Sequence, residues 1–459
     1  MQDIPSTEEE WDELAEVVSA SGGNHPHHMA MDWHENIQDG GLKAKDATLE
    51  DKCAIIARIG ILTLSAGAGG WRVRETMNRI ARKLGVVCSA EMGLLTISLT
   101  CVDGTDRETL VVTLPKTGIN TPRLWRMETF LKDLEACCAD LTVRECHRLM
   151  DQIERDTSKG YKPWQYGLAS GFACCAFTFL LGGGPIEMGC ALVGAGLGHF
   201  VNKLIGAKRI NTFACISVAV ATACVSYLLA LTLLGFIIPG AGTHIAGYIG
   251  AMLFVIPGFP LITSGLDIAQ MDFKSGLERM AYALSIILVA TLTGWLVATL
   301  VHLQPTEFDP QGLSPEMLFL LRLITSFVGV YGFSIMYTSP MKMAATAGLI
   351  GAVANTLRLT LVDASVAPEA AAFAGALAAG LLASAVRRKL TFPRLSLTVP
   401  SIVIMVPGLY MYRAMFYMAT NDAMNSVSWL FRAAMIVIGL PIGLAVARIL
   451  TDRHFRYIS

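Results

Sequence analysis

The chain has 459 residues, of which 53% are hydrophobic and 16% are charged, and its mean hydropathy is +0.51. Soluble domains carry about 25% charged residues, so the composition excludes a protein that is soluble throughout. The net charge of −1 argues against a nucleic-acid-binding protein, because such a protein needs a basic face. We therefore expect a lipid bilayer, and no nucleic acid, as a partner.

The charges divide the chain into two parts. Residues 1–162 carry 19 Lys and Arg and 26 Asp and Glu, whereas residues 163–459 carry 17 and 11. This division predicts an acidic soluble part followed by a membrane domain. The segment Thr7–Glu13 is acidic where a secretory signal would be basic and then apolar, so we expect no such signal. The eleven cysteines lack a CxxC pair, which favours free thiols over disulfides or metal.

Residues 1–47 are predicted to be a flexible tail. The stretch Ser21–His28 together with His34 contains four of the nine histidines. A metal site there is one interpretation, but no cysteine or regular ligand spacing accompanies the histidines, so a solvated tail is favoured. We expect no metal and no cofactor.

Residues 48–160 are predicted to form a small cytosolic α+β domain. Thr48 is a helix N-cap, Thr142–Glu145 is a capping box, and Asp103-Gly104 signals a hairpin. The expected elements are a helix from Thr48, a helix over Trp71–Leu84, strands over Val86–Ala90, Leu94–Cys101 and Thr109–Leu114, and helices over about 121–138 and 142–156.

From Trp164 onward, apolar segments reach the length of about 20 residues that a bilayer core requires. We predict ten transmembrane helices, over about 165–182, 187–205, 211–234, 244–266, 280–301, 317–336, 343–362, 368–386, 397–418 and 429–450. The connectors at 183–186, 235–243, 302–316, 363–367 and 419–428 contain no Lys or Arg, whereas the alternate connectors are basic. The positive-inside rule then places both termini in the cytoplasm of a cell (inner) membrane protein.

An internal repeat relates the two halves of the membrane domain. Phe254–Phe259 resembles Ile404–Leu409, 150 residues further on, and Gly183–Pro185 resembles Thr338–Pro340. Five spans are an odd number, so the halves must be inverted relative to each other. We predict two inverted five-helix repeats, at 161–305 and 306–459, an architecture that many secondary transporters share.

The two Pro-Gly steps inside predicted spans, Pro257-Gly258 and Pro407-Gly408, are the first candidate site. Proline removes a backbone donor and glycine loosens the helix, which frees backbone groups that a polar substrate can satisfy. The alternative is a plain kink satisfied by neighbouring helices. Because both steps fall at repeat-related positions, we favour the binding role.

Charged residues inside the predicted spans are the second group of candidates, because each is costly in lipid. Arg358 and Arg413 lie deepest, and an arginine that faces a cavity can hold a carboxylate in a forked pair. Alternatively, these arginines pair with Asp267 or Glu187 and only hold helices together. Asp267 and Glu187 are our candidates for proton coupling, although Glu187, like Arg432, lies near a helix end.

Other polar residues in the predicted spans are weaker candidates. Asn202 and Asn355 end related small-residue helices and are expected to hydrogen-bond the substrate or another helix. His199 and His244 could relay protons, but packing roles are favoured. Glycine spacings such as Gly167/Gly171 and Gly439/Gly443 predict close helix packing or dimerisation, so a homo-oligomer stays open. Motifs for ATP binding and for hydrolases are absent from the sequence, so we do not expect an enzyme.

At these motifs the sequence resembles the threonine/serine exporters. The resemblance lies in Leu62–Gly85, Phe179–Gly184, Ile256–Asp267 with Gly276 and Arg279, and Met405–Arg413, and it covers about residues 50–450. It implies a cytosolic domain joined to ten spans and efflux of threonine and serine driven by the proton motive force. Some relatives divide the two halves between two proteins and are linked to succinate export. The sequence departs from the family at Ser264–Asp267, which lacks an arginine before the aspartate.

We therefore predict a secondary exporter of small amino acids. A dicarboxylate exporter, or a non-transporting scaffold or sensor, is the alternative. The predicted substrate-binding residues are Pro257, Gly258, Pro407, Gly408, Arg413, Arg358, Asn202 and Asn355, and the predicted proton-coupling residues are Asp267 and Glu187.

Overall fold

The computed structural model describes residues 31–35, 37–38, 40–137, 141–303, 307–387 and 389–456. The chain divides into two compact units, Met1–Gly160 and Tyr161–Ser459, and each is described by itself. The histidines of Ser21–His28 lie outside the described residues.

The first unit contains a three-stranded antiparallel sheet in the order β1-β2-β3. Its elements are α2 (Leu49–Ser65), α3 (Gly70–Leu84), β1 (Val87–Met92), β2 (Thr96–Asp103), β3 (Asp106–Thr113), α4 (Thr121–Cys137) and α5 (Val143–Ser158). The predicted hairpin is present, because Asp103 pairs with Asp106 around a turn in which Gly104 has φ +60°. The predicted capping box at Thr142 and Glu145 is also present.

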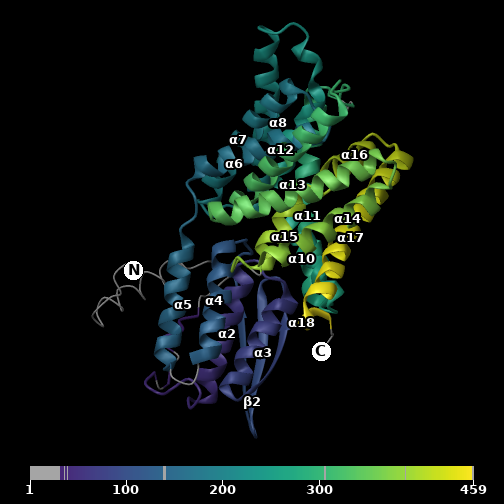
Figure 1. The fold of residues 1–459 in the computed structure, drawn as a ribbon. Helices are drawn as coiled ribbons and strands as arrows, with labels where there is room; N and C mark the ends of the chain where they lie inside the picture. Colours follow the sequence, from purple (N-terminus) through teal and green to yellow (C-terminus); the bar gives the residue numbers. More distant parts are fainter. Residues whose placement is uncertain are drawn as a thin grey trace. The chain divides into compact units, whose positions relative to one another are not determined.

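Helix α2 is the centre of the first unit. It packs on the sheet, on α3, and on α4 and α5 (Figure 1). Nearly all of its residues are buried, as expected of a helix that is apolar almost all round. Residues 40–47, which the sequence analysis assigns to the tail, lie against this unit: Ala44 is fully buried and its N–H donates to Leu141 O at 2.8 Å.

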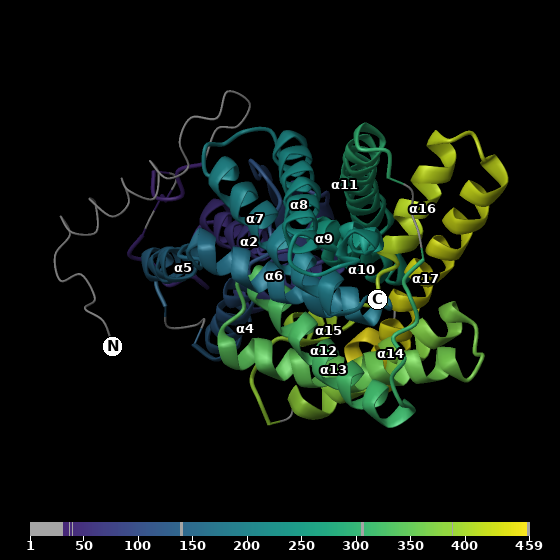
Figure 2. The ribbon, with the colours of Figure 1, turned by 90° about the horizontal axis from the view of Figure 1, so that it is seen from above.

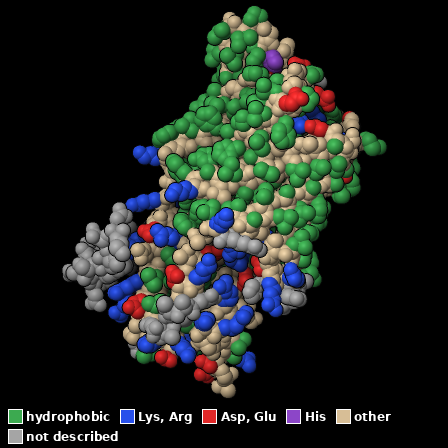
Figure 3. Space-filling view, viewed as in Figure 1, with side chains coloured by type: hydrophobic (Ala, Val, Ile, Leu, Met, Phe, Trp, Pro, Cys, Tyr) green, Lys and Arg blue, Asp and Glu red, His purple; other side chains and the backbone are tan. Residues whose placement is uncertain are grey.

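The second unit is almost entirely helical in the part that the structure describes. Its elements are α6 (Pro163–Leu180), α7 (Pro185–Gly206), α8 (Thr212–Gly235), η1 (Ala241–Thr243), η2 (Ile245–Gly247), α9 (Tyr248–Met252), η3 (Leu253–Val255), α10 (Gly258–Ala269), α11 (Phe273–Leu300), α12 (Pro315–Met336), α13 (Met341–Asp363), α14 (Pro368–Arg387), α15 (Arg394–Val403), α16 (Gly408–Ala419), α17 (Ala423–Thr451) and α18 (Arg453–Arg456). On the face of this unit that Figure 3 shows, hydrophobic side chains form a broad cover, as a lipid-facing surface requires.

Seven of these helices are long and apolar enough to cross a membrane: α7, α8, α11, α12, α13, α14 and α17. Two bent pairs raise the number to nine, namely Ile245–Val255 with Gly258–Ala269, bent by 56°, and Arg394–Val403 with Gly408–Ala419, bent by 50°. We call them the first and the second broken span. Helix α6, at the first predicted span, is not among the nine, since it is only 18 residues long and begins with the polar run Pro163–Tyr166.

Close packing of small residues holds the helices of the second unit together. A Cβ added to Gly171 on α6 would lie 2.7 Å from Leu192 O on α7, and one added to Gly198 on α7 would lie 2.7 Å from Ala219 O on α8. A Cβ on Gly439 of α17 would lie 3.0 Å from Glu369 O on α14. The glycine spacings therefore serve helix packing within the chain, as predicted. Figure 2 shows α9, α10 and α15 near the middle of the unit, with α8 and α11 on one side and α13 and α14 on the other.

Candidate functional site

Both predicted Pro-Gly breaks are complete interruptions of the helix, with the same backbone conformation. Pro257 has φ −80° and ψ 59°, and Pro407 has φ −82° and ψ 58°. In each break the glycine N–H donates to the carbonyl two residues back, from Gly258 to Ile256 at 2.8 Å and from Gly408 to Val406 at 2.9 Å. These are inverse γ-turns, and a new helix begins directly after each.

The two breaks pack against each other. A Cβ on Gly408 would overlap Ile256 Cδ1 and lie 2.7 Å from Leu253 Cδ2, and a Cβ on Gly258 would overlap Val403 Cγ2. Each glycine therefore admits the apolar segment that precedes the other break. This packing joins the two broken spans to each other, and it is compatible both with a kink satisfied by neighbouring helices and with a binding role.

A cavity of about 500 Å³ lies at the second break. Its wall includes Pro407, Gly408 and the first residues of α16, the end of α6 at Leu180 and Leu181, and residues 307–311 of the connector before α12. Arg358 of α13, Arg413 of α16 and Trp429 of α17 complete its polar and aromatic lining. The cavity thus collects four of the predicted site residues: Pro407, Gly408, Arg358 and Arg413.

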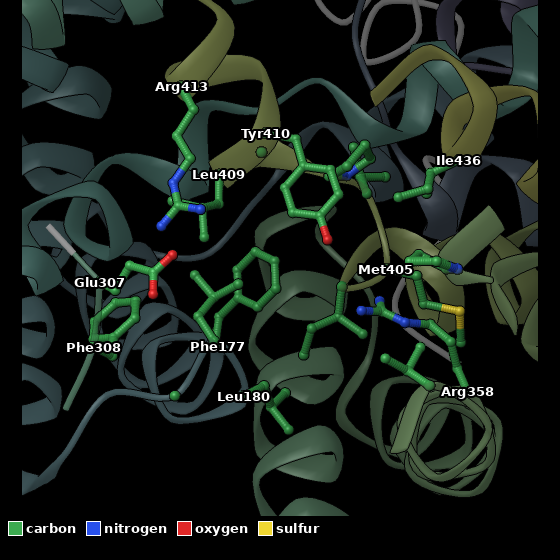
Figure 4. A pocket seen from close by; sticks show the side chains of 18 of the residues that line it. Phe177, Leu180, Glu307, Phe308, Arg358, Met405, Leu409, Tyr410, Arg413 and Ile436 are labelled. Carbon is green, nitrogen blue, oxygen red and sulfur yellow. The ribbon is translucent and has the colours of Figure 1, made fainter. Parts of the chain in front are cut away.

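The two arginines lie on opposite sides of this cavity, with the Tyr410 ring between them (Figure 4). The Arg413 guanidinium lies 4.7 Å from the centre of the Trp429 ring, in a cation–π contact. Among the described residues, neither Arg358 nor Arg413 has an ion-pair partner. The alternative that they pair with Asp267 or Glu187 is wrong, because those carboxylates are engaged elsewhere.

Two carboxylates of the 302–316 connector, neither of them among the predicted site residues, also line the cavity. They are Glu307 and Asp309, and Figure 4 shows the Glu307 carboxylate pointing toward the Arg413 guanidinium. Gln311 fixes this connector by donating from Nε2 to Phe179 O and to Gly183 O, each at 3.0 Å. The sequence feature that could have identified Glu307 and Asp309 is the acidity of their connector, which joins the two halves and lacks Lys and Arg.

Asp267 is fully buried and belongs to an ion pair between α10 and α11. Its Oδ2 lies 3.4 Å from Arg279 Nε and accepts a hydrogen bond from Ser275 Oγ at 2.8 Å. The sequence has no arginine directly before Asp267. The basic partner of Asp267 is instead Arg279, which lies on the next helix. Glu187 pairs instead with His244, at 2.6 Å from Oε1 to Nδ1.

Four predicted substrate-binding residues lie outside the cavity lining. Pro257 and Gly258 do so because the first break faces Val403 and Val406 of the second broken span. Asn355 is buried on α13 and donates to Ser326 Oγ of α12 at 2.9 Å, so it holds two helices together. Asn202 is half-buried on α7.

His199 is buried between aromatic rings rather than in the cavity. Its ring lies 6.0 Å from that of Tyr166 and 5.3 Å from that of Phe254. This is the packing role that the sequence analysis favoured.

The first unit contains a separate cluster of charged groups around the buried Arg58. This arginine pairs with Asp151, which also lies 2.8 Å from His34 Nε2, and its Nη1 lies 3.1 Å from His147 Nδ1. Although burial opposes it, the hydrogen bond from His34 and the charge of Arg58 hold the pKa of Asp151 below its usual range. Burial and the Arg58 charge lower the pKa of His147 to about 3. The cluster attaches His34 to the core of the first unit, in which Arg58 is 1% exposed.

Comparison with known proteins relates most of the chain to one family. Residues 54–301 match the family model for threonine/serine exporters, and residues 322–450 match a second model, described as "Threonine/Serine exporter, ThrE". A protein of Mycobacterium tuberculosis (strain ATCC 25618 / H37Rv), described as "Probable threonine/serine exporter", is 22% identical over 423 residues, which are 86% of this chain and 75% of that protein. No solved structure matches the chain significantly.

Proposed function

Because this chain belongs to the threonine/serine exporter family, we propose that it exports threonine and serine across the cell membrane, driven by the proton motive force. The observation that carries the proposal is the cavity at the second break, whose two arginines have no ion-pair partner among the described residues. A buried or half-buried guanidinium without a carboxylate is costly in a membrane protein, so a ligand carboxylate is the expected partner.

The cavity offers matching groups for each end of a zwitterionic amino acid. Arg413 takes the carboxylate, assisted by the N–H groups at the start of α16, where the helix dipole favours an anion, and Arg358 adds positive charge on the opposite side of the cavity. Glu307 and Asp309 take the ammonium group. The volume of about 500 Å³ accommodates a small amino acid with water.

We propose that the second unit is built from two inverted repeats of five helices, at 161–305 and 306–459. Recurring backbone conformations support this proposal. Residues with positive φ recur at a spacing of 156 positions, as Gly182 with Thr338 and Arg209 with Ser365, and at a spacing of 150, as Met271 with Asn421. Helices α10 and α16 have 12 residues each and begin 150 positions apart.

In the proposed topology α6 is the first span and brings the nine candidate spans to ten, and the Lys/Arg-free connectors face outward. The cavity, which borders the 302–316 connector, then opens toward the outer side. Residues 48–160 are the proposed cytosolic domain, and both termini lie in the cytoplasm. Alternating access follows from movement of one repeat against the other around the paired breaks.

The proposal assigns proton coupling to Asp267 and Glu187, the two buried carboxylates of the predicted spans. Asp267 is held in an ion pair with Arg279, and Glu187 lies in a hydrogen bond with the His244 imidazole, so gain or loss of a proton changes a contact between helices. Direct substrate contact by Pro257, Gly258, Asn202 and Asn355 stays a prediction.

A dicarboxylate is the second candidate substrate, because two arginines on opposite sides of one cavity match two carboxylates. Glu307 and Asp309 oppose it, since they add negative charge to the same cavity.

Proteoliposomes loaded with labelled threonine, serine or succinate test the proposal. An imposed pH gradient should accelerate efflux of threonine and serine, with succinate much slower. Preferential efflux of succinate would favour the second candidate. Efflux of none of the three would contradict an exporter and favour a scaffold or sensor.

A further inference from the structure

A carboxylate–imidazole pair stands where the first broken span begins. Glu187 Oε1 of α7 lies 2.6 Å from Nδ1 of His244, the residue directly before η2. The Glu187 side chain is 4% exposed, whereas that of His244 is 24% exposed. The pair is therefore a buried acid beside a partly exposed imidazole.

The same carboxylate is connected to the wall of the cavity. Glu187 Oε2 accepts the N–H of Gly184 at 3.0 Å and so caps the start of α7. Two residues earlier, Gly182 lines the cavity, and the Gly183 carbonyl accepts from Gln311 of the connector that also carries Glu307. The segment Leu181–Gly184 thus joins the pair to the cavity.

The imidazole side of the pair is connected to the first broken span. Tyr227 Oη of α8 donates to His244 O at 2.7 Å. A Cβ on Gly247 would overlap Tyr227 Oη and lie 2.7 Å from Glu187 Cβ. A change in the contact between Glu187 and His244 is therefore transmitted directly to the start of η2 and α9.

The other titratable groups near the pair are Tyr227 and Cys190, which is buried one turn after Glu187 on α7. Neither carries a charge near neutral pH in its ordinary state. Among the described residues, no lysine or arginine pairs with Glu187 or His244. The nearest ionisable partner of each member of the pair is therefore the other member.

The equivalent position of the second broken span carries a permanent charge. Arg394 stands 150 residues after His244 and begins α15. It donates to Gly380 O and Ala447 O, each at 3.3 Å, and to the hydroxyls of Ser384 and Thr451. An arginine keeps its proton throughout the accessible pH range, whereas an imidazole gains or loses one between pH 5 and 8. The first broken span thus follows a side chain that can exchange a proton, His244, whereas the second begins with one that keeps its charge, Arg394.

We infer that the Glu187–His244 pair is the proton-binding site through which the pH on its side of the membrane acts on the cavity. The inference rests on the proposed exporter function and assigns its coupling to named atoms. One proton from solvent binds at His244 and is shared with Glu187, and a second neutralises the carboxylate. Neutral Glu187 is a weaker acceptor for Gly184 N–H and for the imidazole, so the Leu181–Gly184 wall and the start of the first broken span loosen together. By linkage, substrate binding lowers the proton affinity of the pair by the same factor.

The test uses the full chain in proteoliposomes and two assays. Exchange of labelled against unlabelled threonine at equal pH reports substrate binding and movement without a gradient. Efflux under a pH gradient reports coupling. For Glu187→Gln and His244→Gln we expect threonine exchange to persist, and we expect acceleration by the gradient to fall by about tenfold or more relative to exchange, a factor within the usual range of coupling.

Asp363→Asn is the matched control, because it removes the carboxylate of another ion pair, with Arg322, at a Lys/Arg-free connector. It should leave acceleration by the gradient unchanged. If the pH gradient accelerates efflux in Glu187→Gln and His244→Gln as much as in the wild type, the inference is overturned. The inference is also overturned if exchange and acceleration by the gradient fall in equal proportion, because that result indicates a structural role. Absence of threonine and serine exchange in the wild type would instead contradict the proposed function.

A measurement on the wild-type protein covers the case in which Glu187→Gln does not fold. Threonine added to purified protein in weakly buffered solution with a pH-sensitive dye should release protons, and His244→Gln should reduce that release. Release that is absent in the wild type, or unchanged in His244→Gln, would overturn the inference.

Discussion

The first and second broken spans bend at the same Pro-Gly step but meet different surroundings. Their prolines agree within a few degrees in φ and ψ, and each glycine is packed against the other span. The first break is enclosed by apolar residues of the second, whereas the second borders a cavity with two arginines. A broken helix therefore creates the opportunity for a polar site, and the side chains of the neighbouring helices decide which break becomes one.

The side chains at repeat-related positions illustrate this difference. At the 156-residue spacing of the proposed repeat, His199 of α7 would correspond to Asn355 of α13, and Asn202 would correspond to Arg358. Of these two helices, α13 alone contributes a charged side chain, Arg358, to the described cavity lining.

The comparison predicts that removal of either cavity arginine has the largest effect on threonine affinity. Arg413→Gln and Arg358→Gln should each weaken threonine binding about 10- to 150-fold, because a hydrogen bond to a charged group contributes about 1.5–3 kcal/mol. Concentration dependence of threonine exchange in proteoliposomes measures this loss.

Arg432→Gln is the control for these substitutions, because its guanidinium also lies over the Trp429 ring, at 5.4 Å, but it does not line the cavity. Threonine affinity should change little in this variant. Equal losses in Arg432→Gln and Arg413→Gln would place the effect in the packing of Trp429 rather than in substrate binding.

Adding one methyl group at either break should destabilise the protein. Gly408→Ala and Gly258→Ala place a Cβ in overlap with Ile256 and Val403, and overpacking of this kind costs about 1–3 kcal/mol. The melting temperature in detergent measures the cost. Gly189→Ala on α7 is the control, because a Cβ there meets nothing within 4 Å. Equal stability of all three variants would contradict the mutual packing of the breaks.

Asn355→Ala should cost about 0.5–1.5 kcal/mol of stability, the usual net contribution of one hydrogen bond, because it loses the bond to Ser326. Threonine affinity should stay near that of the wild type. A fall in affinity with unchanged stability would instead support the direct substrate contact that the sequence predicted for Asn355.

The smallest effect should come from the exposed connector acid. Glu307→Gln should weaken threonine relative to succinate about two- to fivefold, since exposed charge pairs contribute about 0.2–1 kcal/mol. Competition between the two compounds in the exchange assay measures the ratio. Glu316→Gln, an exposed acid at the start of α12 that does not line the cavity, should leave the ratio unchanged. An unchanged ratio in Glu307→Gln would remove this residue from recognition of the ammonium group.

Local chemistry in the sequence predicted much of the fold and part of the site. The hairpin at Gly104, the capping box at Thr142 and both breaks follow from short-range rules about glycine, proline and polar caps, so they could be predicted. Arg358 and Arg413 could be selected as candidates because a charged residue stands out in an apolar segment, whichever neighbour its side chain faces.

The remaining contacts depend on packing between distant segments. Pairing of Asp267 with Arg279, and of Glu187 with His244, requires knowledge of which helix faces meet. Glu307 and Asp309 became site residues only because Gln311 holds their connector against α6. The cavity lies at the second break and not at the first. Its position likewise depends on contacts between segments that are far apart in the sequence.

Direct binding of labelled threonine to the purified protein tests the central claim most closely. The wild type and Arg432→Gln should bind threonine, and serine should displace it, while Arg358→Gln and Arg413→Gln should lose most of the binding at the same concentration. Binding of threonine that is equally strong in all four proteins would contradict a substrate site at the second break.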